Sequence, residues 1–482
     1  MLIIGIVLLV LSRIIINKKE IFFRLSLGII LYSLILSSQS WIIEGDLGIL
    51  GGLFHINNLI NGIEIYIYLI SLLLLSLILK NHHKFISSEY YIMILFSLLG
   101  MVLLICSYDL ISTFLSIEFQ SLSLYIITTI TKREAIAAGL KYYLLGSLSS
   151  AILLLGLVLI YIVTGVTQYD SLFLLLYLNC KIDTFYFIII IIMIMVGLLF
   201  KIGAAPFHNW APDVYDGVPT IITSWIAIMG KISILIFICI TQSILFNNNW
   251  NDNNIILNLF EIILAISTFL SLIIGSTLGL VQHKIKRLLA YSSISHLGFI
   301  LLALIAYQQS WVITGLISFL FYMFQYWISL ICTFAILIFL GRVYDLQYIK
   351  FLKGLFYLNP LITLSLIINL FSLAGIPPLI GFFGKQMVLY TSLLNGYYLL
   401  SIVAILTSVI SAVYYLKIVQ TTIFDNSIIE NNKTIINVFN LKDDNLSLIS
   451  WIISLITLIT LLYFINPVII LDFIHLLVLS ID

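Results

Sequence analysis

The stretch GLLFKIGAAPFHNWAPDVYDGVPT, residues 197–220, places a lysine, Lys201, at the end of the apolar run 188–200. The whole segment is long enough to cross a bilayer as a helix. A charged side chain at that depth is costly, and it marks a functional site by default. Three more ionisable residues share this setting, and they are Glu118, Lys231 and Lys385. Four such groups in a chain with little charge predict a path for protons or ions through the membrane.

The composition places the chain in the membrane. Of its 482 residues, 62% are hydrophobic and only 9% are charged, whereas soluble domains carry about 25% charged residues. A net charge of +1 argues against a nucleic-acid partner, which requires a clustered basic face. The cysteines 106, 180, 239 and 332 form no CxxC pair, and no GxGxxG or Walker-type loop occurs. We therefore predict no metal, iron–sulfur, nucleotide or flavin site in this chain.

Apolar runs of about 20 residues, the length that a membrane-spanning helix needs, follow one another along the sequence. We predict an all-α polytopic membrane protein with about fourteen transmembrane helices, at 1–16, 21–43, 59–80, 88–106, 109–131, 136–164, 184–207, 218–241, 255–280, 288–306, 311–340, 360–392, 396–420 and 447–475. The longest polar connection, 421–446, is too short for a soluble domain. Residues 1–482 are thus expected to form a single membrane domain.

Basic loops give the orientation. Those rich in lysine and arginine all follow odd-numbered predicted spans, at 17–24, 80–84, 131–134, 281–287 and 341–353. The positive-inside rule puts these loops in the matrix or the cytoplasm. With an even number of spans, both termini then lie on the opposite side. The loop 208–217, with Asp213 and Asp216, departs from this pattern.

Two predicted spans contain helix breakers, GAAP at 203–206 and GIPP at 375–378. Proline removes a helix hydrogen bond and clashes with the preceding turn. In lipid, the freed backbone groups are tolerated only where protein or a water-filled cavity satisfies them. Interrupted helices at matching positions of two halves point to a transport site, although two ordinary proline kinks are the alternative.

The two breaks also align with each other, because matching Gly203 with Gly375 matches Pro206 with Pro378. We therefore expect two inverted five-helix repeats, each with one broken helix. The expected division of the chain is N-terminal helices at 1–80, a first antiporter-like repeat at 88–241, a second at 255–420, and a loop with a C-terminal helix at 421–482.

The buried charges suggest a switch. Glu118 lies near the middle of the fifth predicted span, either as a structural hydrogen-bonding group or as the charge partner of a buried lysine. Burial favours the neutral form of a lysine, whereas a nearby carboxylate favours the charged form. Moving a Glu118–Lys201 pair apart would therefore release a proton, and the two titrations are expected to be coupled.

Other residues extend this path. Lys231, mid-span on the next helix, is a candidate for the next proton hop. Lys385 follows the second break and is expected to be buried, the alternative being a side chain that snorkels from a helix end. His296 is either a relay or a satisfied structural histidine. Lys141, nearer a span end, is a second-rank relay candidate.

Four further ionisable residues are given structural roles. Glu64 and Glu261 lie close to their span starts and are expected at the interface. His208, beside Pro206, is expected to cap or stabilise the break, with a role in proton transfer as the alternative. Asp109 is at a span start, where an acidic residue suits the helix dipole.

Several segments together resemble the antiporter-like membrane subunits of respiratory complex I. They are EFQSLSLY (118–125), KIGAAPFHNWAPDVYDGVPT (201–220), KRLLAYSSISHLGF (286–299) and LAGIPPLIGFFGK (373–385). The likeness covers roughly the fourth to the thirteenth span, and the second segment is the most specific. It implies that Glu118 and Lys201 are a coupled pair, that Lys231 is a connecting lysine, and that Lys385 serves the second half-channel. It extends relay roles to His296 and Lys141.

The resemblance also implies a function and a setting. It implies a subunit of proton-translocating NADH:ubiquinone oxidoreductase in the mitochondrial inner membrane, or alternatively the bacterial plasma membrane, with both termini toward the intermembrane space. NADH, FMN, iron–sulfur clusters and ubiquinone are then expected in partner subunits, with neighbouring antiporter-like subunits and membrane lipids as contacts. Two other functions stay open: a subunit of a multi-subunit cation/proton antiporter, and a non-pumping scaffold of the membrane arm.

Overall fold

The computed structural model describes residues 1–15, 18–41, 47–78, 87–130, 133–177, 184–246, 255–307, 312–341, 347–424 and 444–479. Within these residues, eleven helices are long and apolar enough to cross a membrane. They are α2 (Lys19–Ser40), α3 (Asn58–Ser76), α4 (Ser88–Cys106), α5 (Leu110–Thr129), α6 (Arg133–Thr164), α8 (Thr184–Ile202), α10 (Thr220–Phe246), α11 (Ile255–Val281), α12 (Ile285–Tyr307), α13 (Val312–Leu340) and α17 (Tyr398–Ile423).

Shorter elements complete the described part of the chain. The helices are α1 (Leu2–Ile15), α7 (Tyr169–Tyr177), α9 (Trp210–Gly217), α14 (Leu355–Leu358), α15 (Pro360–Ala374), α16 (Ile380–Leu394), α19 (Asp444–Leu462) and α20 (Val468–Leu479), with a 3₁₀ turn, η2 (Ile349–Leu352). The strands β1 (Leu47–Ile49) and β2 (Phe54–Ile56) pair antiparallel between α2 and α3. An all-helical polytopic membrane fold is thus confirmed, with one small hairpin added.

The predicted count of fourteen spans is not confirmed, because eleven of the described helices reach the length and apolarity of a span and α1, at the first predicted span, is shorter. Two other predicted spans are divided. The predicted span 360–392 is two helices, α15 and α16, on either side of the GIPP segment. The predicted C-terminal span 447–475 is also two helices, α19 and α20, and Pro467 immediately precedes the second. Proline lacks the N–H that a continuous helix would need at this point, which explains the division. The predicted loop 80–84 and most of the loops 242–254 and 421–446 lie outside the described residues.

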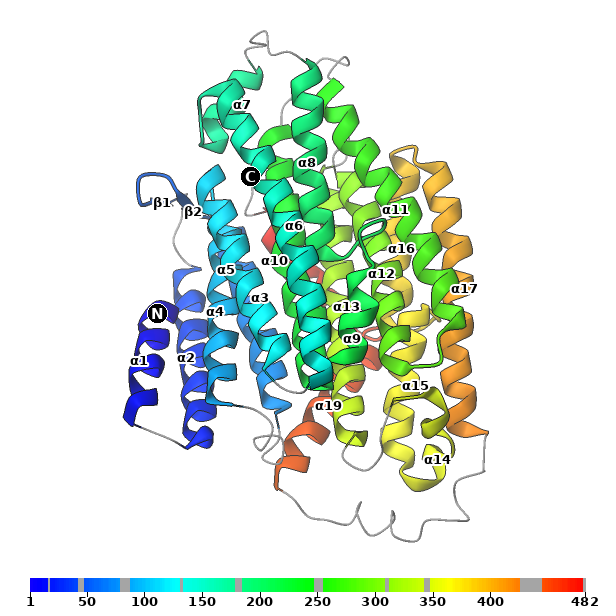
Figure 1. The fold of residues 1–482 in the computed structure, drawn as a ribbon. Coiled ribbons are helices and arrows are strands. Elements are labelled where there is room, and N and C mark those ends of the chain that lie inside the picture. Colours follow the sequence, from blue (N-terminus) through cyan, green and yellow to red (C-terminus); the bar gives the residue numbers. More distant parts are fainter. Residues whose placement is uncertain are drawn as a thin grey trace.

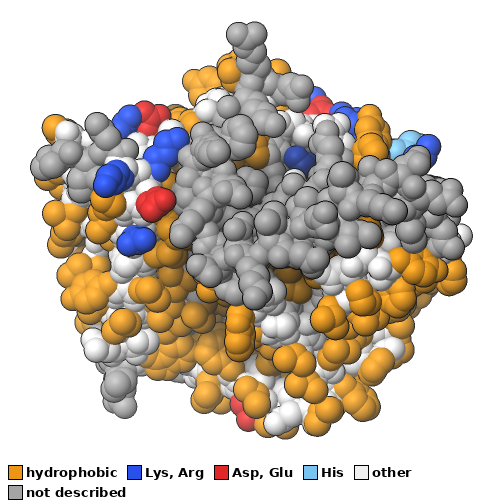
Figure 2. Space-filling view, turned by 90° about the horizontal axis from the view of Figure 1, so that it is seen from below, with side chains coloured by type: hydrophobic (Ala, Val, Ile, Leu, Met, Phe, Trp, Pro, Cys, Tyr) orange, Lys and Arg blue, Asp and Glu red, His pale blue; other side chains and the backbone are white. Residues whose placement is uncertain are grey.

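Three helices form the centre of the bundle. The apolar window of α10 is buried throughout, and those of α12 and α13 are 94% and 83% buried. Figure 1 shows these helices toward the middle, with α1 and α2 at one flank and α17 at the other. A helix that is apolar all round is expected in such an interior position. The flanking helices instead turn Leu and Ile side chains outward, and Figure 2 shows hydrophobic side chains over much of the visible flanks.

Glycines allow neighbouring helices to pack closely, as is usual in membrane bundles. A Cβ added at Gly100 of α4 would lie 2.6 Å from the backbone nitrogen of Gln120 in α5. One added at Gly275 of α11 would lie 2.5 Å from the backbone nitrogen of Ser295 in α12. Any side chain at these two positions would therefore push the helix pairs apart.

The two interrupted helices end in the same way. α8 ends before Gly203 and α15 ends before Gly375, and both glycines adopt left-handed φ angles, 78° and 83°. The backbone N–H groups of Gly203 and Ala204 both reach the Leu199 carbonyl, at 3.0 and 3.1 Å. Those of Gly375 and Ile376 reach the Phe371 carbonyl at the same two distances. This pattern is a glycine-based helix C-cap, so the backbone groups freed by each break are partly satisfied locally.

A cis peptide bond follows each cap, at Ala205–Pro206 and at Pro377–Pro378. The chain then resumes as α9 in the first case and as α16 in the second. In Figure 1, α8 lies above α9, whereas α15 lies below α16. The two interrupted helices therefore run in opposite directions through the bundle.

Candidate functional site: a buried row of ionisable side chains

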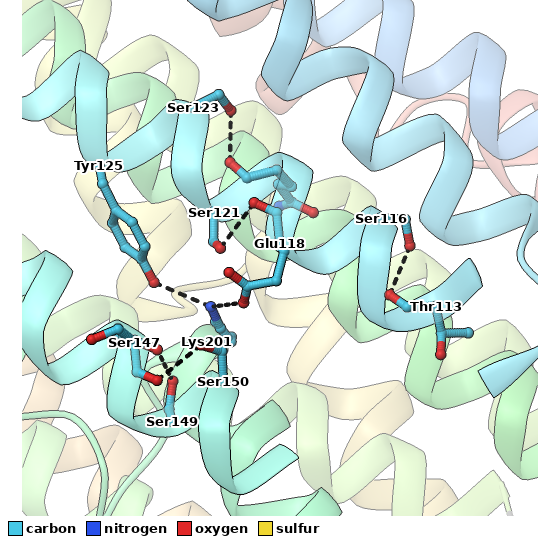
Figure 3. A network of polar contacts seen from close by, with 12 residues as sticks. Thr113, Ser116, Glu118, Ser121, Ser123, Tyr125, Ser147, Ser149, Ser150 and Lys201 are labelled. Atoms are coloured by element: carbon cyan, nitrogen blue, oxygen red, sulfur yellow. Dashed lines mark hydrogen bonds and ion pairs between the residues drawn. The ribbon is translucent and has the colours of Figure 1, made fainter. Parts of the chain in front are cut away.

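Lys201 is held between a carboxylate and a phenol. Its Nζ lies 3.4 Å from Glu118 Oε1 and donates to the Tyr125 hydroxyl at 3.1 Å. Figure 3 shows the ammonium nitrogen between these two groups. Glu118 and Tyr125 both come from α5, and their spacing of two helical turns puts them on one face. The Lys201 side chain is 3% exposed and that of Glu118 is 22% exposed, so the pair is largely screened from solvent.

The break in α8 positions Lys201. The residue lies in the last turn of α8, where the carbonyl end of a helix favours a cation. Trp210, at the start of α9, donates its indole N–H to the Phe200 carbonyl at 2.9 Å and stacks on Tyr142 of α6 at 4.5 Å between ring centroids. These contacts tie both halves of the interrupted helix to α6 and fix the direction in which Lys201 points.

Room for Tyr125 depends on one glycine. A Cβ at Gly146 of α6 would come within 2.0 Å of the Tyr125 hydroxyl oxygen. The absence of a side chain at Gly146 therefore lets this hydroxyl reach Lys201.

Lys231 is the most deeply buried of the three lysines at 201, 231 and 385, at 1% exposure in α10. Its Nζ donates to the Ser293 hydroxyl of α12 at 3.1 Å and lies 5.7 Å from the centroid of the Tyr215 ring. α10 also contacts Gln120 of α5. The Gln120 side-chain N–H donates a hydrogen bond to the Gly230 carbonyl, and its amide oxygen accepts one from the Ser233 hydroxyl. Lys231 thus lies between the helix of Glu118 and the helix of His296.

His296 makes hydrogen bonds through both ring nitrogens. Nδ1 is 2.8 Å from the Tyr322 hydroxyl of α13, and Nε2 is 3.1 Å from the Tyr415 hydroxyl of α17. The ring also stacks on Tyr326 at 4.6 Å. Ser293 precedes His296 by three residues on α12, so the partner of Lys231 lies on the same helix face. A neutral imidazole must donate at one nitrogen and accept at the other, which suits a group that passes a proton between two hydroxyls.

Lys385 caps the second broken helix. Its Nζ donates to the carbonyl of Ala374, the last residue of α15, at 2.7 Å and lies 5.5 Å from the Phe299 ring centroid. Phe299 in turn stacks on Tyr322 at 5.7 Å. The residue is 7% exposed, so the side chain is buried, as predicted, rather than extended toward a helix end. A cation at a free helix carboxyl end is favourably placed.

Lys141 lies apart from this row. It forms an ion pair with Asp213, and its side chain is 44% exposed. Asp213 also faces Arg287, while Asp216 binds both Arg287 and Lys284 at 3.0 and 2.8 Å. Asp213 and Asp216, the acidic residues in an otherwise basic set of loops, lie in α9, and each is paired with basic side chains from other segments.

The carboxylates expected at interfaces have specific partners. Glu64 accepts a hydrogen bond from the Cys106 thiol at 3.1 Å, and Glu261 accepts one from the Tyr397 hydroxyl at 3.1 Å. Asp109 is the N-cap of α5 and forms a capping box with Ser112, in keeping with its predicted place at a span start. His208 is buried between α8 and α9, and its Nδ1 has no hydrogen-bond partner in the described part of the chain.

Sequence reasoning missed the hydroxyl groups that connect the charges. Tyr125 carried a usable signal, because it follows Glu118 on the same helical face. Tyr322 and Tyr415 carried none, since their partner His296 is remote in sequence and the chain has 27 tyrosines. Within the described residues, no group of three or more His, Cys, Asp or Glu side chains is arranged to hold a metal ion.

The chain is similar to membrane subunits of known complexes. A protein-family model described as NADH:quinone oxidoreductase/Mrp antiporter, TM, matches residues 107–411. An NADH-ubiquinone oxidoreductase chain 2 of Rhizopus oryzae is 43% identical, over 95% of this chain and 95% of that protein. An NADH-quinone oxidoreductase subunit N of Hydrogenovibrio crunogenus is 34% identical, over 80% of this chain and 77% of that protein. The match to the family model contains all four buried ionisable residues.

Solved structures share the fold. A chain of respiratory complex I from Thermus thermophilus superposes with a TM-score of 0.77 at 26% identity, over 98% of this chain and 97% of that chain. A chain of the Mrp complex from Dietzia superposes with a TM-score of 0.81 at 18% identity, over 99% and 95%. At the latter identity the likeness concerns the fold alone.

Proposed function

The chain belongs to the family of antiporter-like membrane subunits that includes NADH-ubiquinone oxidoreductase chain 2, and we propose that it translocates protons within the membrane arm of respiratory complex I. The observation that carries this proposal is the Lys201 ammonium, held at the break of α8 between the Glu118 carboxylate and the Tyr125 hydroxyl. A buried cation whose counter-charge is on another helix is stabilised only while the two helices keep their distance. Its protonation is therefore sensitive to helix movement.

The first step is the separation of this pair. Two unit charges at about 4 Å attract by about 4 kcal/mol at an effective dielectric constant near 20. Loss of an interaction of this order changes a protonation equilibrium by roughly three powers of ten. A movement of α5 relative to α8, driven by quinone reduction in other subunits, would thus weaken the hold of Lys201 on its proton. The separation of Glu118 from Lys201 is the switch.

The released proton then passes along the centre of the bundle. Lys231 lies on the next helix and contacts Ser293, one turn before His296. His296 hydrogen-bonds to Tyr322. The Phe299 ring, which carries no exchangeable proton, packs against both Tyr322 and the Lys385 ammonium, so water of the half-channel would carry the proton over this last gap. We place the proton route from the matrix along Lys201, Lys231 and Lys385 to the intermembrane space, through hydrated half-channels.

The two opposed interrupted helices support the proposed repeats at 88–241 and 255–420. Each break has a glycine cap and a nearby buried lysine, and the two directions of travel in Figure 1 are opposite. Inverted repeats of this kind place ion sites near the middle of a membrane. The helices before residue 80 and after residue 421 then flank the pair of repeats.

The setting follows from the family. We place the chain in the mitochondrial inner membrane, because the chain 2 relative is more similar to it than the bacterial subunit N. The basic residues at 281–287 put that end in the matrix and both termini toward the intermembrane space. The chain works as one subunit of an enzyme complex, whose NADH, FMN, iron–sulfur clusters and ubiquinone belong to partner subunits.

Native electrophoresis tests membership of the complex. In mild detergent, peptides of this chain should co-migrate with a very large band that oxidises NADH. Migration in a smaller band without this activity, together with sodium efflux independent of NADH, would favour a cation/proton antiporter subunit. Normal pumping after single substitution of all four buried charges would favour a structural scaffold.

A further inference from the structure

A fifth ionisable group, Glu64, lies in the membrane away from the lysine row. It is in the seventh position of α3, so it lies about 9 Å along the helix from its first residue. Its carboxylate accepts a hydrogen bond from the Cys106 thiol of α4 at 3.1 Å. The ion pairs found among the described residues do not include Glu64. This carboxyl group is therefore held by a neutral donor, whereas Glu118 faces a cation.

Glu64 lines a large cavity between the N-terminal helices. The cavity has a volume of about 400 Å³, and its wall includes Ser37 of α2 together with Asn61 and Tyr68 of α3. It extends to Met1 and to hairpin residues at the end of the bundle. A cavity of this size with polar groups on its wall is roomy enough for several water molecules. The cavity wall is mostly apolar, with Leu99 and Leu103 of α4 among its residues, so its few polar groups, Glu64 included, are the places where water would bind.

Cys106 lines a second, smaller cavity of about 110 Å³ on its other side. Asn57 borders both cavities, and its buried side-chain oxygen has no hydrogen-bond partner within the described part of the chain. A buried acceptor of this kind is normally satisfied either by a protein donor or by an ordered water molecule. Asn57 is an observation independent of Glu64, and it too indicates water at this place.

The site is distinct from the lysine row. The smaller cavity also touches Cys239 of α10, which follows Lys231 by eight residues and lies about 12 Å farther along the helix. The residues between them include the buried apolar side chains of Ile232, Leu235 and Ile236.

We propose that Glu64 and Cys106 form a second proton-binding site, whose proton exchanges with the water at the α2–α3 end of the bundle. A carboxylate at this place has no cation beside it among the described ion pairs, and burying an unpaired charge is costly. The Cys106 thiol can donate to a carboxyl oxygen in either protonation state, and this hydrogen bond is stronger when the acceptor is ionised. When the carboxyl group is protonated, its own O–H donates into the larger cavity.

A hydrophobic carbodiimide tests this proposal, because it reacts with protonated carboxyl groups in apolar surroundings. The carboxyl oxygen bonds to the central carbon of the reagent and the carboxyl proton moves to one of its nitrogens, so nothing leaves. We would label the intact complex in native membranes at a series of pH values and map the modified peptides by mass spectrometry. Glu64 should be labelled at neutral and acidic pH, and labelling should decline as the pH rises. The exposed Glu89, paired with Arg13, is the unlabelled control.

Variants sharpen the test. Glu64→Gln should remove the labelled peptide. Cys106→Ala removes the donor to the carboxylate, so labelling should persist to higher pH, whereas Cys106→Ser keeps a donor and should restore the original profile. Absence of Glu64 labelling across the pH series, or labelling that does not change with pH, would overturn the site. A Cys106→Ala profile identical to that of the unmodified protein would remove the thiol from it.

The aqueous side is tested in sealed vesicles. Leu53→Cys in the hairpin reports, through a membrane-impermeant maleimide, which compartment the α2–α3 end faces. Labelling of Glu64 should follow the pH of that same compartment, and dependence on the opposite compartment would contradict the proposal. None of these outcomes depends on Lys201, so the failure of this proposal and the failure of the proton path are distinguishable.

Discussion

Lys201 and Glu118 stand 83 positions apart in the sequence, and their charged atoms meet at 3.4 Å between α8 and α5. The lysine is in the last turn before a glycine-capped break, and Tyr125 supplies its second hydrogen bond. Because the two charges come from different helices, a movement of α8 relative to α5 would change the distance between them.

Tyr125→Phe should lower proton pumping without preventing assembly. The change removes one hydrogen bond to a charged group, worth about 1.5–3 kcal/mol, and leaves the ring in place. Gly146→Ala should act through the same contact, because its methyl group would meet the Tyr125 hydroxyl. The measurement is the number of protons pumped per NADH oxidised in sealed vesicles. Pumping equal to that of the unmodified protein in both variants would show that this hydroxyl is dispensable.

Tyr415→Phe should slow pumping more than Tyr414→Phe. The Tyr415 hydroxyl bonds to His296, whereas the neighbouring Tyr414 hydroxyl is 3.5 Å from Ser295. Both residues are buried in α17 and lose the same atom, so the pair is matched for packing. We would compare initial rates of proton uptake at equal NADH oxidation. Equal rates in the two variants would argue for a structural histidine.

Lys385→Met should abolish pumping and weaken the end of α15. The side chain stays unbranched and apolar along its stem but is one atom shorter and no longer offers a cation to the Ala374 carbonyl. Loss of a cation at a helix carboxyl end costs about 0.3–1 kcal/mol, and up to about 2 kcal/mol when partly buried. Thermal unfolding of the purified complex would report the small stability loss, and vesicle acidification would report pumping. Retained pumping would exclude Lys385 from the proton route.

Lys141→Ala should leave pumping close to normal. The side chain is half-exposed and paired with Asp213 at the end of α9, and exposed ion pairs contribute about 0–1 kcal/mol. The same vesicle assay checks this expectation. A large loss of pumping, with assembly intact, would instead place Lys141 on the route.

Most of the helical fold was predictable because lipid leaves the backbone little choice. A chain crossing a bilayer must satisfy its hydrogen bonds internally, so long apolar runs such as 88–106 become helices with the predicted bounds. The two breaks were also predictable, because glycine and proline mark them. The hairpin strands and α7 were missed, since three-residue strands and a nine-residue helix leave no clear periodic signal. Pro467 was a signal for dividing the last span, but it was not used.

Only the charged residues of the site could be predicted from the sequence. A lysine or glutamate inside an apolar run is conspicuous because of its desolvation cost, and Lys201, Lys231 and Lys385 are all buried. Their roles on a proton path stay predictions. The tyrosine hydroxyls at His296 were hidden, because aromatic residues fill 13% of the chain and only the packing of α12 against α13 and α17 selects among them.

The most direct test of the account is the number of protons pumped per electron in Lys201→Ala. NADH oxidation with a hydrophilic electron acceptor, together with native electrophoresis, would first establish that the variant complex assembles. We expect the proton-to-electron ratio to fall strongly, because the ammonium that pairs with Glu118 is gone. An unchanged ratio in the assembled variant would contradict the assignment of Lys201 to the proton path.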